Sequence, residues 1–256
     1  MNIALPTVVL FILLIPGLLF RRFYYTEEFS KEYFKQTFFG TFFSAFLPSL
    51  LFHICWYFVV AYLGYNIDLS ILGDLLSGQN DENVYRAIES NIGKITGYNF
   101  SIAIAAGLGG FLSKKVIRNY KLDRTYKLFR FQNSWHYVLK GEFFDFPRAS
   151  FDLEDSGVEE IEFVYVDAII DTNAGTFLYE GIFVDYELSA NSGLNYITLK
   201  NTSRKLISIN KQDDGESYPI NGHIVVLPFH QIKNINLSFY RIIQANDDLL
   251  DVELVE

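Results

Sequence analysis

The stretch AFLPSLLFHICWYFVVAYLGY, Ala45 to Tyr65, contains no acidic or basic residue along its whole length. It belongs to a longer uncharged run, residues 37–65, which is long enough to cross about 30 Å of hydrocarbon with some tilt. Tyr57, Tyr62 and Tyr65 lie toward one end of the run and Tyr33 precedes the other, as in the aromatic belts of membrane interfaces. The run therefore predicts a membrane-spanning helix, and Pro48 predicts a kink within it.

A first apolar run, residues 4–20, is followed directly by Arg21 and Arg22. A cleaved signal peptide carries its positive charges before the apolar run and small residues after it, which is the reverse of this order. The run therefore predicts a retained span, near the short limit for crossing a bilayer. Pro16 and Gly17 near its end predict a bend or an end to the helix.

A third apolar run, residues 98–112, is short and rich in small residues. Ala103 and Gly107 are four residues apart, and so are Ala106 and Gly110. Such spacing lets helix backbones approach closely in lipid, where no hydrophobic force drives helices together. We expect this run to pack against the other spans or against a second copy of the chain, as a homo-oligomer.

Lysine and arginine are distributed unevenly between the connecting segments. Four basic residues lie between the first two spans and five follow the third, whereas the loop 66–97 contains only Arg86 and Lys94. Because cytoplasmic segments are enriched in Lys and Arg, this predicts an outer N-terminus, three crossings and a cytoplasmic C-terminal half. The loop 66–97 shows two helical patterns, which predict either a cap over the outer face or a solvated connector.

The two halves of the chain differ in charge. Residues 1–126 carry 11 basic and 9 acidic residues, a net charge of +2, while residues 127–256 carry 10 and 21, a net charge of −11. The halves predict a transmembrane domain and a cytoplasmic domain. An acidic domain repels phosphate backbones, so we expect no nucleic-acid partner. The single cysteine, Cys55, excludes an internal disulfide and a cysteine-based zinc site.

Residues 164–243 consist of short runs rich in Val, Ile, Tyr and Phe. Breaks at 173–175 (NAG) and 191–193 (NSG) predict hairpins, and Gly181 within a long run predicts a bulge or bend. The predicted fold class is α+β, with three transmembrane helices followed by a mainly antiparallel small β-barrel or sandwich.

Two segments flank the predicted barrel. An acidic linker is expected over residues 145–162, and a disordered acidic tail over residues 246–256. The carboxylates of the linker lack the ligand order and the fixed glycine of a calcium loop, so they predict a solvated acidic face.

A long bent second strand, and a last hairpin around LPFHQIKNINLSFY, give this half an order that resembles SH3-like and Sm-like small barrels. The whole arrangement, spans with basic flanks, then FRFQNSWHYVLKG and a barrel that contains YEGIFVDYEL, is similar to a group of bacterial membrane proteins of unassigned function. That resemblance implies a location in the bacterial inner membrane and imports no activity.

Isolated polar residues are the candidates for function. His53 lies within the second span, where an ionisable side chain is costly; it predicts either a functional group or a neutral imidazole bonded to a neighbouring helix. A polar and aromatic group follows the third span, suited either to a ligand cleft or to anchoring of the barrel. Its members are Asn133, Trp135, His136 and Tyr137.

No metal or cofactor is expected. His223 and His230 are separated by Pro228 and do not have metal-ligand spacing. The sequence contains no serine nucleophile elbow, phosphate loop or HExxH motif.

Three functions stay open. The first is a non-enzymatic protein that anchors a cytoplasmic barrel at the membrane, where it binds a protein or a small ligand. The second is a pore-forming or membrane-disrupting effector, such as one of anti-phage defence, that is triggered through the barrel and assembled through Gly107 and its neighbours. The third is a membrane enzyme that uses His136 or His53.

Overall fold

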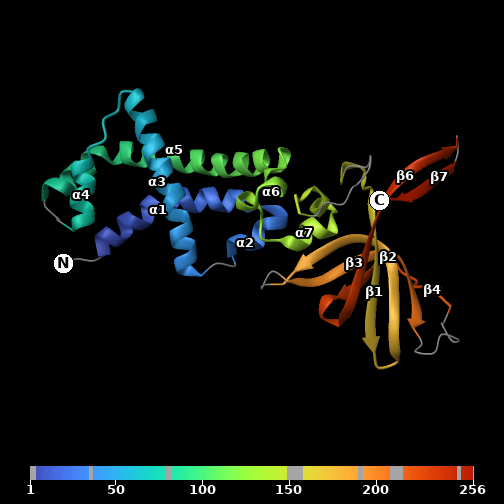
Figure 1. Cartoon of the computed structure of the whole chain (residues 1–256). Helices are drawn as coiled ribbons and strands as arrows, with labels where there is room; N and C mark the ends of the chain where they lie inside the picture. Colours follow the sequence, from blue (N-terminus) through green and yellow to red (C-terminus); the bar gives the residue numbers. More distant parts are fainter. Residues whose placement is uncertain are drawn as a thin grey trace. The chain divides into compact units, whose positions relative to one another are not determined.

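The chain divides into two compact units, Met1–Tyr120 and Lys121–Glu256, which are drawn in the computed structural model of Figure 1. The first unit is helical and the second is built around an antiparallel sheet, so the predicted α+β class is confirmed. The division falls six residues before the predicted one, at residue 120 instead of 126. The structure describes residues 4–34, 37–78, 82–148, 158–189, 193–207, 216–246 and 249–255.

The first unit contains three helices that are long and apolar enough to cross a membrane. The candidate spans are Leu5–Tyr24, Phe38–Tyr62 and Val84–Asn119. The elements of this unit are α1 (Ala4–Tyr24), η1 (Glu27–Phe29), α2 (Ser30–Phe34), α3 (Phe38–Tyr62), α4 (Leu69–Ser77) and α5 (Glu82–Asn119).

The helix α5 is one continuous helix of 38 residues. This helix covers both the second half of the predicted outer loop, up to residue 97, and the predicted third span, residues 98–112, without a break. The polar segment before residue 98 contains no proline, and each residue added to an existing helix gains a hydrogen bond. Gly93 and Gly97 each lower helix stability by only about 1 kcal/mol, so they do not end it.

The helices α1 and α3 approach each other closely at a glycine. A Cβ atom on Gly17 would overlap the backbone carbonyl oxygen of Ala45, which is fully buried. One turn earlier, the carbonyl of Leu13 accepts a hydrogen bond from His53 of α3 at 3.0 Å. Pro16 lies between these two points, inside α1. Because proline lacks an amide proton and bends a helix, carbonyls near it become available to neighbouring helices.

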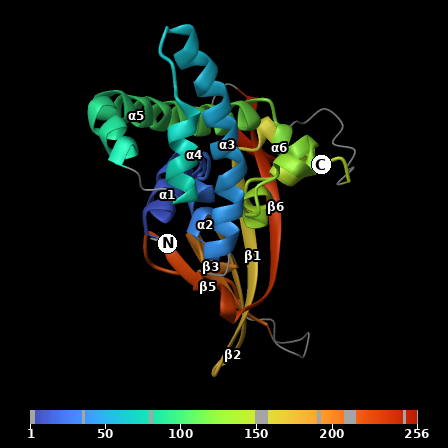
Figure 2. The same ribbon diagram turned by 90° about the vertical axis from the view of Figure 1, so that its left-hand side faces the viewer.

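The helix α3 runs across α1 and α5 in both views, so that its two ends extend beyond them (Figures 1 and 2). Only Ala45 and Ser49 of α3 are buried. Large apolar side chains at its two ends are exposed, among them Phe39 (72%) and Phe58 (66%). Surfaces of this size and composition are suited to lipid and not to water.

The second unit begins with short helices and continues as a seven-stranded antiparallel sheet. Its helical elements are α6 (Leu122–Thr125), η2 (Lys127–Phe129), α7 (Ser134–Leu139), η3 (Glu142–Asp145), η4 (Val158–Glu160) and η5 (Phe229–Gln231). Its strands are β1 (Phe163–Thr172), β2 (Gly175–Leu188), β3 (Leu194–Ile207), β4 (Tyr218–Pro219), β5 (Val225–Pro228), β6 (Ile232–Asn246) and β7 (Leu249–Leu254).

The strand order is β4-β3-β2-β1-β6-β7, and β5 also pairs with β3. The predicted last hairpin around LPFHQIKNINLSFY is corrected, because β5 pairs with β3 whereas β6 pairs with β1. The turn η5, three residues long, therefore joins strands on the two sides of the β1–β2–β3 meander. Such a short connection requires the sheet to curl, which produces an antiparallel half-barrel.

Long strands bend where their register shifts. The register of β2 against β3 shifts between Glu180 and Ile182, so the bulge predicted at Gly181 is confirmed. A Cβ at this glycine would lie 3.1 Å from the carbonyl oxygen of Lys200. The absence of a side chain at Gly181 therefore allows β3 to approach closely at the bend. The predicted hairpin at Asn173 and Ala174 is also present, with Thr172 paired to Gly175. In the second predicted hairpin, residues 190–192 lie outside the described part of the chain.

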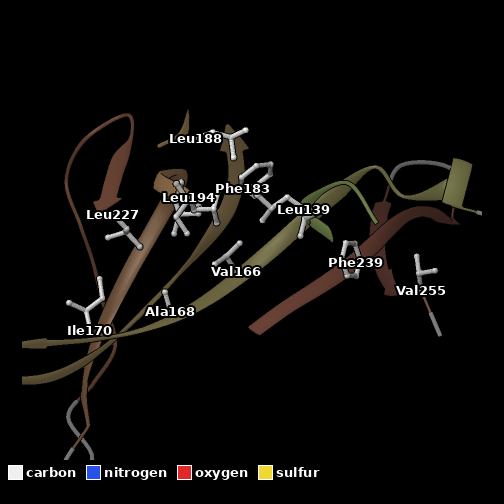
Figure 3. Close-up of a cluster of buried hydrophobic side chains, with 13 residues drawn as sticks. Leu139, Val166, Ala168, Ile170, Phe183, Leu188, Leu194, Leu227, Phe239 and Val255 are labelled. Atoms are coloured by element: carbon white, nitrogen blue, oxygen red, sulfur yellow. The ribbon is translucent and has the colours of Figure 1, made fainter. Parts of the chain in front are cut away.

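The core of the second unit is a cluster of buried apolar side chains from several strands and from α7 (Figure 3). Alternate residues of β1 are buried, including Val166 and Ala168, both 0% exposed. Leu139 of α7 is also 0% exposed and joins the same cluster. The segment that precedes the sheet is therefore part of its core.

The tail predicted to be disordered from residue 246 is corrected by β7, which pairs with β6. Its alternating sequence LLDVEL suits a strand with two unlike faces, and Arg241 of β6 pairs with Glu253 at 2.7 Å. Of the predicted acidic linker, residues 149–157 lie outside the described part of the chain. Two of its carboxylates form ion pairs: Glu159 lies 3.0 Å from Lys121 and Glu160 lies 2.9 Å from Arg241.

Candidate functional site

Buried polar side chains concentrate in the segment that enters the second unit. Among the described residues, ten polar or charged side chains are buried, and five of these lie between Asp123 and Glu142. Burying such groups is costly unless each finds a partner, so their partners show what the segment does. We call residues 121–145 the entry segment.

Asn133 fixes the start of α7 and links it to the sheet. Its side-chain oxygen accepts a hydrogen bond from the amide of His136 at 3.1 Å, the usual role of an N-cap residue. Its side-chain nitrogen donates to the hydroxyl of Tyr186 in β2 at 2.9 Å. One amide group, 1% exposed, therefore both caps a helix and holds it on a strand.

His136 lies between the same tyrosine and a carboxylate. Its Nδ1 is 3.2 Å from the hydroxyl of Tyr186, and its Nε2 is 3.6 Å from Oε1 of Glu142. The second distance is too long for a hydrogen bond and suits an ion pair only when the imidazole is protonated. Tyr186 also accepts from Asn133, and Glu142 also pairs with Arg124, so each end of this series has a second partner.

Arg124 connects the carboxylates of the entry segment. Its guanidinium lies 3.1 Å from Glu142 and 2.5 Å from Asp145, and its side chain is 11% exposed. Lys121 adds ion pairs to Asp145 at 3.5 Å and to Glu159 at 3.0 Å. Removing one partner of a buried ion pair is strongly destabilising, so the pair of Arg124 with Glu142 holds the two ends of the entry segment together.

The remaining predicted residues of this group point to different partners. The hydroxyl of Tyr137 donates to Asp123 at 2.8 Å and accepts from the amide of Phe131 at 3.2 Å. Trp135 meets Phe229 of η5 edge to face, with ring centroids 5.1 Å apart. The structure thus brings Asn133 and His136 together at Tyr186, whereas Tyr137 bonds to Asp123 and Trp135 packs on Phe229.

A second polar group lies among the candidate spans. The carbonyl of Leu13 only accepts hydrogen bonds, so Nε2 of His53, 3.0 Å away, carries the proton and donates. Nδ1 then accepts from the hydroxyl of Tyr98 in α5, also at 3.0 Å. Ser49 donates to the same carbonyl of Leu13. His53 therefore joins α3 to both α1 and α5 through its two ring nitrogens.

The small residues predicted for helix packing lie against α1 of the same chain. A Cβ on Gly110 would overlap the carbonyl oxygen of Phe20, and one on Gly107 would lie 3.3 Å from the ring of Phe23. Ala106 is 0% exposed and Ala103 is half-buried. This contact is intramolecular, so the stripe is occupied within one copy.

Near the C-terminal ends of α1 and α5, the buried side chain of Lys114 contacts several oxygen atoms in and next to η1. Lys114, 7% exposed, donates to the carbonyl of Thr26 at 3.1 Å and to Glu27 at 2.7 Å, and lies 3.5 Å from Glu28. The Lys114 ammonium holds the pKa of the Glu27 carboxyl below its ordinary value. The sequence marked this lysine only as a topology signal.

No group of three or more His, Cys, Asp or Glu side chains that could bind a metal ion occurs among the described residues. His223 precedes β5 and His230 lies in η5, while Cys55 is exposed on α3. The described residues therefore offer a positioning network in the entry segment and a polar clamp around His53.

No family model, curated protein or solved structure matches this chain. The fold alone defines its class: an α+β chain in which three membrane-compatible helices precede an antiparallel half-barrel. The resemblance to SH3-like barrels and to bacterial membrane proteins stays a prediction.

Proposed function

We propose that this chain is a non-enzymatic protein of the bacterial inner membrane that holds a cytoplasmic β-domain at the membrane, where the domain binds a protein or a small ligand. One observation carries the proposal: the two units differ in how they place their apolar side chains. The first unit contains three helices long and apolar enough to span a membrane, with exposed side chains such as Phe39 and Phe58, whereas the second has a core cluster of buried apolar residues in its sheet.

The helix directions support three alternating crossings. Leu13 of α1 contacts residue 53 of α3 and Arg21 contacts residue 41, so along the contact where α3 crosses α1 the two chains have opposite directions. Gly110 of α5 contacts Phe20, and Lys114 contacts the residues that follow α1, so α1 and α5 run in the same direction. Chains that cross a membrane three times alternate in this way. The basic residues then gather at the ends of α1 and α5, as the cytoplasmic side requires.

The entry segment supports the anchoring role. It begins directly after α5 and is held to the sheet by Asn133, His136 and Leu139. Buried charged and polar side chains that bond to one another and to the sheet in this way are suited to fixing a domain in place.

Impermeant cysteine labelling tests the orientation. In a chain in which Cys55 is replaced by Ser, we introduce Ser70→Cys in α4 or Asn173→Cys at the β1–β2 turn, both at exposed positions. In intact spheroplasts an impermeant maleimide should label the first and spare the second, and lysis should make both reactive. Labelling of Asn173→Cys in intact cells would contradict the proposed orientation.

Site-specific photo-crosslinking in cells tests the binding role. The crosslinker is placed at exposed apolar positions of the sheet region, Val184, Ile224 or Val226. A discrete adduct from a subset of these positions is expected. Failure of all three to give an adduct would count against a binding module.

The pore-forming alternative rests on the small-residue stripe of α5. Because α1 covers Gly107 and Gly110, assembly through that stripe would first require α1 to leave it. The mass of the detergent-extracted protein measures whether the chain forms a homo-oligomer at all. A monomer would remove the basis of this alternative.

A further inference from the structure

A loop near the start of the second unit carries its apolar side chains on the surface. Residues 125–129 are all exposed, and we call residues 125–130 the apolar loop. Leu128 is 88% exposed, Tyr126 57% and Phe129 37%. No other large apolar side chain among the described residues of this unit is as exposed as Leu128.

The base of the apolar loop is fixed. The guanidinium of Arg130 donates to the carbonyl of Asp123 at 3.3 Å and to that of Arg124 at 3.1 Å, which closes the loop across its neck. The same guanidinium lies 3.6 Å from the ring centroid of Phe146. The next residue, Phe131, is 4% exposed. The apolar side chains are therefore presented on a rigid base and do not belong to an unfolded segment.

The composition of the apolar loop indicates which kind of surface it contacts. Tyr126, Leu128 and Phe129 surround Lys127, which is exposed and takes part in no ion pair with the described residues. Aromatic and aliphatic side chains beside a cation are typical of segments that lie in the headgroup region of an anionic membrane. The loop also begins only six residues after α5 ends at Asn119. If α5 spans the membrane, the bilayer is the apolar surface that lies within six residues of the loop.

We propose that the apolar loop inserts Tyr126, Leu128 and Phe129 into the headgroup region of the cytoplasmic leaflet, with Lys127 against anionic phosphates. This rests on the proposed function, since it requires α5 to end at that leaflet. The loop then gives the β-domain a second contact with the membrane. Because Asn133 of the entry segment is bonded to Tyr186 of the sheet, and Arg124 ties the start of that segment to Glu142, that contact orients the whole domain.

Spin-label depth measurement on the full chain tests this. In the Cys55→Ser background, labels are placed at Leu128→Cys, at Ile224→Cys (58% exposed) as the matched control, and at Phe58→Cys as a report on the spans. The protein is reconstituted in vesicles of phosphatidylcholine with or without phosphatidylglycerol. Collisions with oxygen report lipid, and collisions with a water-soluble nickel chelate report water.

The expected result is an oxygen-to-nickel ratio several-fold higher at Leu128 than at Ile224, with a larger ratio when phosphatidylglycerol is present. Water exposure at Leu128 with lipid at Phe58 would overturn the inference and leave the spans intact. Absence of lipid contact at Phe58 would refute the proposed function itself. A label at Leu128 shielded from both reagents would reveal a protein occupant, and equal ratios at Leu128 and Ile224 would show no specific insertion; both results overturn the inference.

Discussion

Single buried polar groups determine how the chain is joined together. The amide of Asn133 and the hydroxyls of Tyr137 and Tyr186 each serve two partners. In water these groups would bond equally well to solvent, so each contact adds little net stability. Removing one partner inside the protein is costly, because the groups left behind stay buried.

Removal of the Tyr137 hydroxyl should therefore destabilise the second unit. Tyr137→Phe deletes the donor to Asp123 at 2.8 Å and the acceptor of the Phe131 amide at 3.2 Å. The expected loss is about 1 to 3 kcal/mol in the free energy of unfolding. Denaturant unfolding of the full chain in detergent, followed by a signal from the sheet, measures it. Tyr126→Phe, which changes an exposed tyrosine, is the control, and equal stability of the two variants would contradict the role given to Tyr137.

The ion pair of Glu27 with Lys114 should make the first unit sensitive to acid. The pKa of Glu27 is lowered in the folded chain, chiefly by the hydrogen bond from Lys114. A lowered carboxyl pKa stabilises the fold at pH values above the ordinary value of about 4.3, and this contribution is lost as the pH falls through the lowered folded value. Thermal unfolding of wild type and Glu27→Gln in detergent should differ at neutral pH and converge in acid.

The side chain of Glu27 is 76% exposed, so the difference at neutral pH should be small, about 1 kcal/mol or less. Glu82→Gln, which removes an exposed pair with Arg86, is the control for a generic loss of charge. A difference for Glu27→Gln that persisted unchanged in acid would rule out the ion pair as its cause.

At the scale of elements, close helix contacts depend on where glycine lies. Gly110 and Gly93 belong to the same helix, α5, yet an added Cβ would overlap the Phe20 carbonyl at the first and meet nothing within 4 Å at the second. The sequence pattern singled out Gly110 from its spacing. It offered no way to tell that α1 would be the partner.

Gly110→Ala should destabilise the first unit by on the order of 1 to 3 kcal/mol, because α1 must move away to admit the methyl group. Gly93→Ala should be neutral or stabilising by up to about 1 kcal/mol, since alanine favours the helix. Thermal unfolding of the two variants in the same detergent compares them directly. If both changes had the same effect, the close approach of α1 and α5 would be refuted.

At the scale of the whole molecule, the division into two units predicts independent stability. Gly110→Ala acts within residues 1–120, and Tyr137→Phe acts within residues 121–256. Mutations in separate units share no partners, so their effects on the free energy of unfolding should add within about 0.5 kcal/mol. Probes in each unit, followed in the double variant, measure this. A shift of the helical transition caused by Tyr137→Phe would show that the units are coupled.

The sequence by itself determined the class of each half, because local patterns carry that information. Uncharged runs such as 37–65 specify helices in lipid, and the alternation of β1 specifies a sheet with one buried face. Gly181 was recognisable as a bulge because a glycine within a strand has few other uses. Asn133 and His136 were recognisable as a polar group beside the third span.

Only the tertiary structure decided how these pieces meet. Tyr186 lies 53 residues from Asn133, and Tyr98 lies 45 residues from His53; no local pattern links such positions. The same holds for β5 and β6, neighbours in sequence that pair with β3 and β1 in place of each other. Strand register, helix partners and hydrogen-bond partners are set by the packing of the folded chain. The reason is that a buried polar group is stable only when it has a hydrogen-bond partner.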